Sequence, residues 1–193
     1  MSLLVLPAPA GTTTPAALLA AVLRDAGVPG VGAEARVVRR CVTCGEPGHG
    51  KPEVPAALAA GWHVSLAHTA TWLVVAASDG GPVGVDVEQV AAVAAHPVAD
   101  VLLSPDERAA GHLEDAAALT RTWVRKEALL KATGHGLAVP PSSVTLRAPG
   151  GDPGLLVWDV PDAAVPRPVA WSETTLGDGD RLALVTAVAL APS

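Results

Sequence analysis

The stretch from Trp123 to Leu137 constrains the fold more than any other part of the sequence. Trp123, Glu127 and Leu130 recur at helical spacing, so they share one face of a helix. The Trp and the Leu predict that this face is buried, where a carboxylate is rare unless it is paired or binds a metal. Lys131 follows Glu127 by four residues, within reach for an ion pair. An ion-paired amphipathic helix and a helix with a functional carboxylate are therefore both open.

The composition limits the classes of protein to which the chain can belong. A chain of 193 residues is long enough for a substantial core, in one domain or in two small fused halves. The net charge of -6 argues against a general nucleic-acid-binding protein. No apolar run is long enough to cross a bilayer, and residues 1–10 lack a basic leader. We therefore expect a monomeric cytoplasmic protein with neither a nucleic-acid nor a membrane partner.

Helix and strand signals follow a similar order in the two halves of the chain, a helix and then several strands. The dipeptide Thr14-Pro15 predicts the start of a helix that ends at Gly27. The segment Ser104-Pro-Asp-Glu107 is a capping box that begins a second helix, ahead of the one that contains Trp123. Strands are expected at residues 2–6, 62–66, 72–78, 83–88, 143–146, 154–158, 169–172 and 182–190.

Alternation in the strand at residues 83–88 places two carboxylates together. Asp86 and Glu88 are separated by one residue, so both point to one face of the strand, while Val85 and Val87 point to the other. Adjacent carboxylates repel one another unless a cation lies between them, and hard oxygen ligands suit Mg²⁺ or Mn²⁺. The pattern indicates a metal site, and a solvated edge strand is the alternative.

A second metal hypothesis concerns Cys41, Cys44 and His49. The Cys-x-x-Cys spacing followed by a His is typical of the start of a zinc site, but four ligands are usual and a fourth is not evident nearby. The alternative is a tight Gly- and Pro-rich loop with two half-buried thiols.

Basic residues gather around this loop and on the helix from Trp123. Arg39, Arg40 and Lys51 flank a segment rich in backbone N–H groups, which suits an anion. The chain has only three lysines, and the other two are Lys126 and Lys131. In a sequence that otherwise favours Arg, a retained Lys indicates a need for a compact donor, for example to a phosphate.

Two long motifs are the most specific features of the chain. Gly84-Val-Asp-Val-Glu88 and, 34 residues later, Trp123–Leu137 resemble the G-(I/V)-D-(I/V)-E and W-x-x-K-E-(A/S)-x-x-K-x-x-G-x-G-L signatures of the 4′-phosphopantetheinyl transferases. The segment Gly50-Lys-Pro52 is similar to an upstream motif of the same family, and residues 64–69 are similar to its N-(I/L)-S-H-S motif. Ser65 stands where that motif usually has Asn.

The resemblance is to the larger, pseudo-dimeric class of these enzymes, which includes the surfactin-type members. It implies an α+β fold of two similar halves related by a pseudo-twofold axis, each a small, mainly antiparallel sheet packed with a long helix. We expect residues 1–90 and 91–193 to form these halves, with the active site in the cleft between them.

The resemblance also implies a reaction. The phosphopantetheine group of coenzyme A would move to a serine of an apo acyl or peptidyl carrier protein, with release of adenosine 3′,5′-bisphosphate. Asp86, Glu88 and Glu127 would hold Mg²⁺ against the pyrophosphate. Glu127 would also be the base for the serine hydroxyl, and Lys131 would neutralise or protonate the departing bisphosphate.

Further residues are implied at the coenzyme A site, where basic groups face a polyanion. The candidates for binding coenzyme A are Arg39, Arg40, Lys51, Pro52, His68, Lys126 and Lys131. Arg121 and Arg125 are either part of a docking face for the carrier protein or ordinary exposed helix residues. Two rival functions are another Mg²⁺-dependent phosphotransferase and a small zinc-stabilised interaction protein.

Overall fold

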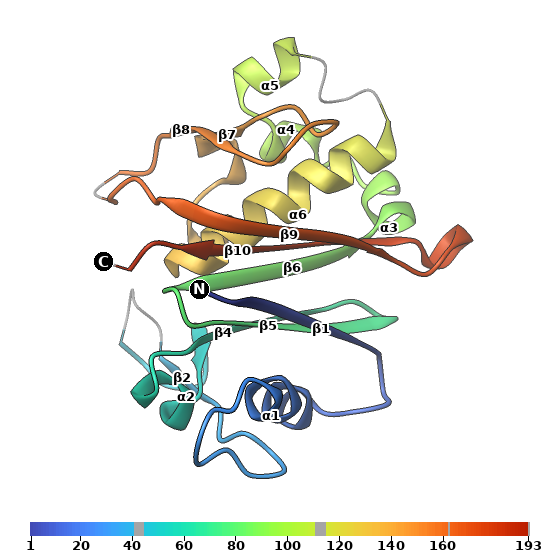
Figure 1. Ribbon diagram of the computed structural model, residues 1–193. Coiled ribbons are helices and arrows are strands. Elements are labelled where there is room, and N and C mark those ends of the chain that lie inside the picture. The colour runs from blue at the N-terminus through green and yellow to red at the C-terminus, as the bar shows by residue number, and fades with distance from the viewer. Residues whose placement is uncertain (41–44, 111–114, 162, 193) are drawn as a thin grey trace.

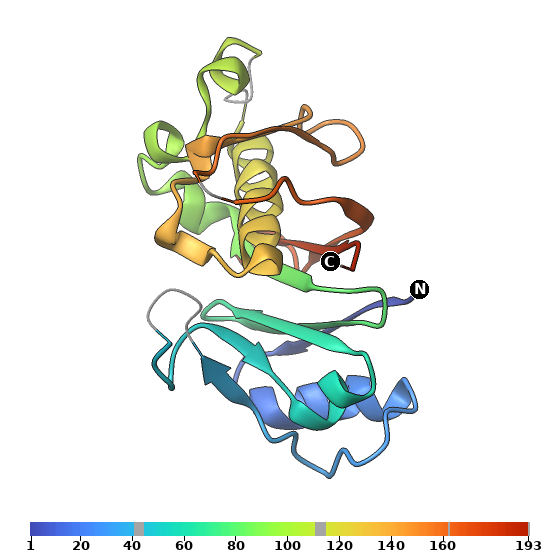
Figure 2. The ribbon, with the colours of Figure 1, turned by 90° about the vertical axis from the view of Figure 1, so that its left-hand side faces the viewer.

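The chain folds into four stacked layers, a helix on each outer side of two small antiparallel sheets (Figure 1). The computed structural model describes residues 1–40, 45–110, 115–161 and 163–192, without the side chains of Arg40 and Leu137. Figure 2 shows the molecule after a 90° turn, with smaller helices and strands around the second long helix, α6 (Ala116–Thr133).

The first sheet consists of β1 (Leu3–Pro9), β4 (His63–His68) and β5 (Trp72–Ser78), in the order β1-β5-β4. The helix α1 (Pro15–Asp25) covers its outer face. The predicted cap is confirmed, because the Thr14 side chain accepts a hydrogen bond from the backbone N–H of Ala17. Leu19 and Leu23 of this helix are fully buried against alternate residues of β5.

The second sheet repeats this arrangement with β6 (Val83–Gln89), β9 (Pro168–Leu176) and β10 (Ala183–Leu190), in the order β6-β10-β9. Its outer face is covered by α6 (Ala116–Thr133). In both sheets the first strand precedes the long helix, the last strand is central, and every pairing is antiparallel. The chain is therefore an α+β protein built from two units of the same topology.

The two sheets share a core between them. Alternate residues of β6, namely Val83, Val85 and Val87, are buried there together with Val74 and Ala76 of β5. The intervening residues of β6 face α6, as the alternation predicts. The strand therefore has an apolar face toward the first sheet and a face toward the helix that carries its carboxylates.

Shorter elements complete the fold. In the first half they are β2 (Val38–Arg40), β3 (Lys51–Glu53) and α2 (Pro55–Ala59). In the second half they are α3 (Val90–Ala94), α4 (Ala99–Leu102), α5 (Pro105–Ala109), β7 (Val144–Leu146), β8 (Leu155–Trp158) and the 3₁₀ turns η1 (Gly136–Ala138), η2 (Pro141–Ser143) and η3 (Gly179–Arg181). The capping box predicted at the start of α5 is confirmed.

Most of the expected elements are present, and the differences lie at their ends. The strand β9 extends four residues beyond the expected Ser172, because it pairs along the whole length of β10. The division of the chain at residues 90 and 91 stays a prediction. Hydrogen bonding groups β6 with the C-terminal strands, so sheet membership changes between Ser78 and Val83. Among the described residues, no helix combines the length and the hydropathy that a membrane span requires.

Candidate active site

The close approach of α6 to β6 brings the two long motifs together. At Gly84 an added Cβ would overlap the backbone carbonyl oxygen of Ala128, so a side chain there would push the helix away from the strand. Because Gly84 has no side chain, the strand approaches the helix closely, and Asp86, two residues further on, lies against the same helix. The glycine of the first motif therefore sets the distance between the motifs.

The ion pair at this junction joins Asp86 to Lys131, with 2.6 Å between Oδ1 and Nζ. The same ammonium donates a longer hydrogen bond, of 3.4 Å, to the carbonyl oxygen of Val85. The sequence placed Lys131 within reach of Glu127, and no hydrogen bond joins these two side chains among the described residues. The lysine thus connects the helix to the strand instead of closing an ion pair within the helix.

Two carboxylate oxygens at this site are buried without a hydrogen-bond partner in the described part of the chain. They are Oδ2 of Asp86 and Oε1 of Glu127, whose residues are 4 % and 5 % exposed. A buried ionised oxygen without a partner is unfavourable, so such atoms indicate a missing ligand or proton. The unusual feature of the sequence, a carboxylate on a buried helix face, is therefore present in the fold.

Burial and mutual repulsion shift the titration of these carboxylates. Burial, together with the charges of Asp86 and Glu88, raises the pKa of Glu127 to about 7. Burial and the charge of Asp86 raise the pKa of Glu88 to about 7. Burial also raises the pKa of Asp86, against the opposing effect of Lys131. A cation at this position would relieve all three effects.

The donor set at the junction fits magnesium. Among the described residues, no three His, Cys, Asp or Glu side chains form a complete metal-binding group. Magnesium is usually bound through only one or two carboxylates, with phosphate oxygens and water as its other ligands. The two free oxygens of Asp86 and Glu127 match that requirement, and Glu88 lies close enough to be coupled to them electrostatically. The assignment of the three carboxylates to a metal stays a prediction.

Lys126, which the resemblance assigns to coenzyme A, lies inside the protein. Its ammonium is fully buried and donates to Glu107 Oε2 at 2.5 Å, to Leu102 O at 2.7 Å and to Pro141 O at 3.1 Å. These three acceptors use its three protons. The contact of Lys126 with coenzyme A stays a prediction that these bonds do not favour, because one step along the helix from Glu127 turns the Lys126 side chain into the protein.

The structure also shows that Arg125 is not part of an exposed docking face. Its residue is 1 % exposed, and its guanidinium makes a bidentate ion pair with Glu173 of β9, with both N–O distances at 2.8 Å. It also donates to the carbonyl oxygens of Ala148 and Gly151. Arg121, one turn earlier, is partly exposed and donates to the carbonyl of Pro149.

The residues expected to bind the 3′-phosphate and adenine end of coenzyme A lie in the first half of the chain. Lys51 of β3 donates to the carbonyl oxygen of Ala132 at the C-terminus of α6, with a distance of 2.7 Å. Burial lowers the pKa of Lys51 to about 8. Lys51 and the buried Pro52 line a cavity of about 240 Å³, with Trp62 and Gly134 among its other lining residues. This cavity lies between the first half of the chain and the C-terminal end of α6.

The other basic candidates are less closely tied to this cavity. Arg39 lies on β2 and donates to the carbonyl of Gly50 at 2.9 Å. His68 is exposed at the end of β4. Arg40 belongs to β2, and its side chain lies outside the described residues. Cys41 and Cys44 also lie outside them, so the zinc hypothesis is not addressed by the structure.

Ser65 makes a hydrogen bond between the two sheets that the sequence did not predict. Its buried hydroxyl oxygen accepts a hydrogen bond from the backbone N–H of Val85, at 3.1 Å. This bond joins β4 of the first sheet to the free edge of β6, directly beside Asp86. The signal in the sequence was only a Ser in place of the usual Asn.

Comparison with known proteins agrees with the two motifs. Residues 82–167 match the sequence model of the 4′-phosphopantetheinyl transferase superfamily. The chain is 32% identical over 131 residues to the 4′-phosphopantetheinyl transferase psf-1 of Bacillus pumilus. That alignment covers 62% of this chain and 50% of the relative, so the chain spans about half the length of the relative that it matches.

The fold is also similar to a solved structure, a holo-(acyl-carrier-protein) synthase from Bacillus anthracis in complex with CoA (3′,5′-ADP). The TM-score is 0.42 and the identity 18%, over 58% of this chain and 96% of that one. The sequence match at residues 82–167 contains both long motifs. The part of the chain that contains both motifs is therefore similar to the 4′-phosphopantetheinyl transferase superfamily.

Proposed function

We propose that this protein transfers the 4′-phosphopantetheine group of coenzyme A to a serine of an apo acyl or peptidyl carrier protein, with Mg²⁺ as cofactor. The observation that carries the proposal is the junction of the two motifs. There Asp86 and Glu127, beside Lys131, each have a buried oxygen without a hydrogen-bond partner in the part of the chain that the structure describes. The repeated topology of the two halves supports membership of the pseudo-dimeric class.

The residues at the junction fit the steps of this reaction. The serine oxygen forms a bond to the phosphorus of the pantetheine phosphate, while the bond from that phosphorus to the bridging oxygen of adenosine 3′,5′-bisphosphate breaks. The serine proton passes to the carboxylate of Glu127, directly or through a water molecule. The ammonium of Lys131 neutralises the charge on the departing bisphosphate.

Asp86, Glu88 and Glu127 would hold the magnesium ion, which when bound supplies positive charge against the pyrophosphate. The side chain of Lys131 is 30% exposed and has two acceptors among the described residues, so its third proton is available to a phosphate. Lys51, Pro52, Arg39, Arg40 and His68 are proposed for the 3′-phosphate and adenine end. The cavity beside Lys51 would receive part of that end.

Incubation of an apo carrier protein with this protein, coenzyme A and Mg²⁺ tests the proposal. Intact-protein mass spectrometry should show that the carrier gains one phosphopantetheine group. A carrier whose modified serine is replaced by alanine, and a reaction with a chelator, are the controls and should show no gain. The absence of modification on several unrelated carriers would argue for another phosphotransferase.

A further inference from the structure

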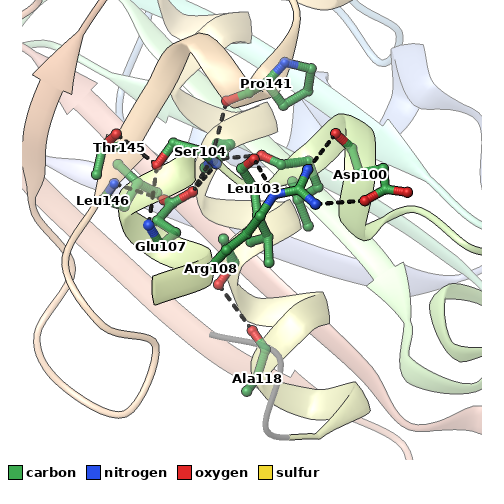
Figure 3. A network of polar contacts seen from close by, with 12 residues as sticks. Asp100, Leu103, Ser104, Glu107, Arg108, Ala118, Pro141, Thr145 and Leu146 are labelled. Carbon is green, nitrogen blue, oxygen red and sulfur yellow. Dashed lines mark hydrogen bonds and ion pairs between the residues drawn. The ribbon is translucent and has the colours of Figure 1, made fainter. Parts of the chain in front are cut away.

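Lys126 connects α6 to three elements on its outer side. Figure 3 shows the polar network in this region, with Glu107, Ser104 and Pro141 labelled. Its ammonium bonds the carbonyl at the end of α4, the carbonyl of Pro141 in η2 and the carboxylate of Glu107 in α5. Both members of the ion pair are essentially inaccessible to solvent, at 0% and 1% side-chain exposure. Such a pair cannot be broken without leaving a buried charge alone, which is strongly unfavourable.

Glu107 is itself fixed on every side. Its Oε2 also accepts from the backbone N–H of Ser104, at 2.8 Å, and its Oε1 accepts from the N–H of Leu146 in β7, at 2.9 Å. Thr145 of β7 donates to the Ser104 hydroxyl oxygen, at 2.9 Å. The carboxylate therefore joins α5, β7 and α6 through buried, charge-assisted hydrogen bonds, which are stronger than neutral ones.

The carboxylate of the proposed base, in contrast, has a buried oxygen that no hydrogen bond among the described residues fixes. Oε1 of Glu127 has no partner in the described part of the chain. Its position is therefore set by the rotation and register of α6. Lys126 is the preceding residue on that helix, so its three bonds fix the backbone from which the Glu127 side chain extends.

We propose that Glu107 is a positioning residue for Glu127, acting through Lys126. The proposal rests on the proposed function, since it assumes that Glu127 takes the serine proton. A small rotation of α6 near Glu127 would displace its carboxylate from the serine, whereas Lys131 is held separately by its ion pair with Asp86 of β6. The expected effect therefore falls on kcat and not on KM.

Two substitutions test this role, Lys126→Met and Glu107→Gln, each assayed at temperatures where circular dichroism shows the variant to be folded. We expect kcat to fall on the order of 10-fold, with KM for coenzyme A within about twofold of wild type. Arg108→Gln is the matched control. It removes an exposed pair with Asp100 from the same helix and should leave both constants unchanged.

Ser104→Ala covers the case in which neither variant folds. It removes the hydroxyl that caps α5 and accepts from Thr145, but leaves the buried ion pair intact. We expect about a threefold loss of kcat at unchanged KM. A folded variant with wild-type kcat would overturn the positioning role alone, since the wild-type control would still modify the carrier. An inactive wild type would overturn both proposals.

Discussion

At the scale of single residues, the most informative feature of the site is a pair of buried carboxylate oxygens without hydrogen-bond partners among the described residues. Asp86 and Glu127 each bury one oxygen that has no hydrogen-bond partner within the described residues, although Lys131 lies beside them. A purely structural ion pair would normally satisfy both oxygens of a buried carboxylate. The two oxygens therefore favour a missing ligand, for which the proposed magnesium ion is the candidate.

Glu127→Gln removes the proposed base with almost no change in size. Coenzyme A binding, measured by isothermal titration calorimetry, should be largely intact. Transfer to an apo carrier should fall by about 100-fold or more, which is within the range of general-base contributions. If turnover stays near the wild-type level, Glu127 is not the base.

Gly84→Ala tests the close contact between β6 and α6. The new methyl would overlap the carbonyl of Ala128, and the helix backbone can move only by disturbing its own packing. We expect a loss of about 3 kcal/mol in the free energy of unfolding, measured with urea. Gly150→Ala is the control. An added Cβ there meets nothing within 4 Å, so unchanged stability is expected.

At the scale of elements, α6 is held by consecutive buried cations on different sides. Arg125 bonds Glu173 of β9, and Thr186 of β10 donates to the same carboxylate. Lys126 bonds Glu107 of α5. The helix is therefore fixed to the sheet beneath it and to the small elements above it, and Glu127 follows directly in the chain.

Arg125→Lys should be costly even though it keeps the charge. A lysine cannot reproduce the bidentate pair with Glu173 together with the bonds to the carbonyls of Ala148 and Gly151. We expect a loss of about 2 kcal/mol in the free energy of unfolding by urea denaturation. Arg108→Lys changes a pair in which the Asp100 side chain is 86% exposed and should cost much less. Equal losses for the two variants would contradict the anchoring role of Arg125.

At the scale of the whole molecule, the two halves meet at the site. Ser65 joins β4 to β6, and Lys51 joins β3 to the end of α6. Both bonds connect the first half to elements that hold the carboxylates. The stability of the whole fold should therefore respond to the charge at this junction.

The raised pKa values of the carboxylates predict how the stability of the fold changes with pH. In the absence of metal, the folded state binds more protons than the unfolded state between about pH 4.5 and about pH 7, because Glu88 and Glu127 titrate near 7 only when folded. Stability should therefore fall as the pH rises through this range. Added Mg²⁺ should raise the melting temperature more at about pH 8 than at about pH 6.

Calorimetric melting at both pH values, with and without Mg²⁺, measures this effect. Glu127→Gln is the matched control, since it removes one of the two titrating groups and should flatten the pH dependence. A melting temperature that rises with pH in the metal-free protein would contradict the account.

The sequence alone determined the local features of this protein. Alternation placed Asp86 and Glu88 on one face of β6, and helical spacing placed Glu127 on a buried face of α6. The capping residues Thr14 and Ser104 marked the starts of their helices. These features depend on residues close together in the chain, so short-range periodicity and capping chemistry were sufficient to predict them.

Only the tertiary structure decided the partners of the charged residues. Lys131 pairs with Asp86 and not with Glu127, Lys126 turns into the protein, and Arg125 lies beneath a loop. Each of these contacts joins residues at least 15 positions apart in the chain. The outcome depends on how closely α6 approaches the second sheet, which Gly84 permits and which no local pattern contains.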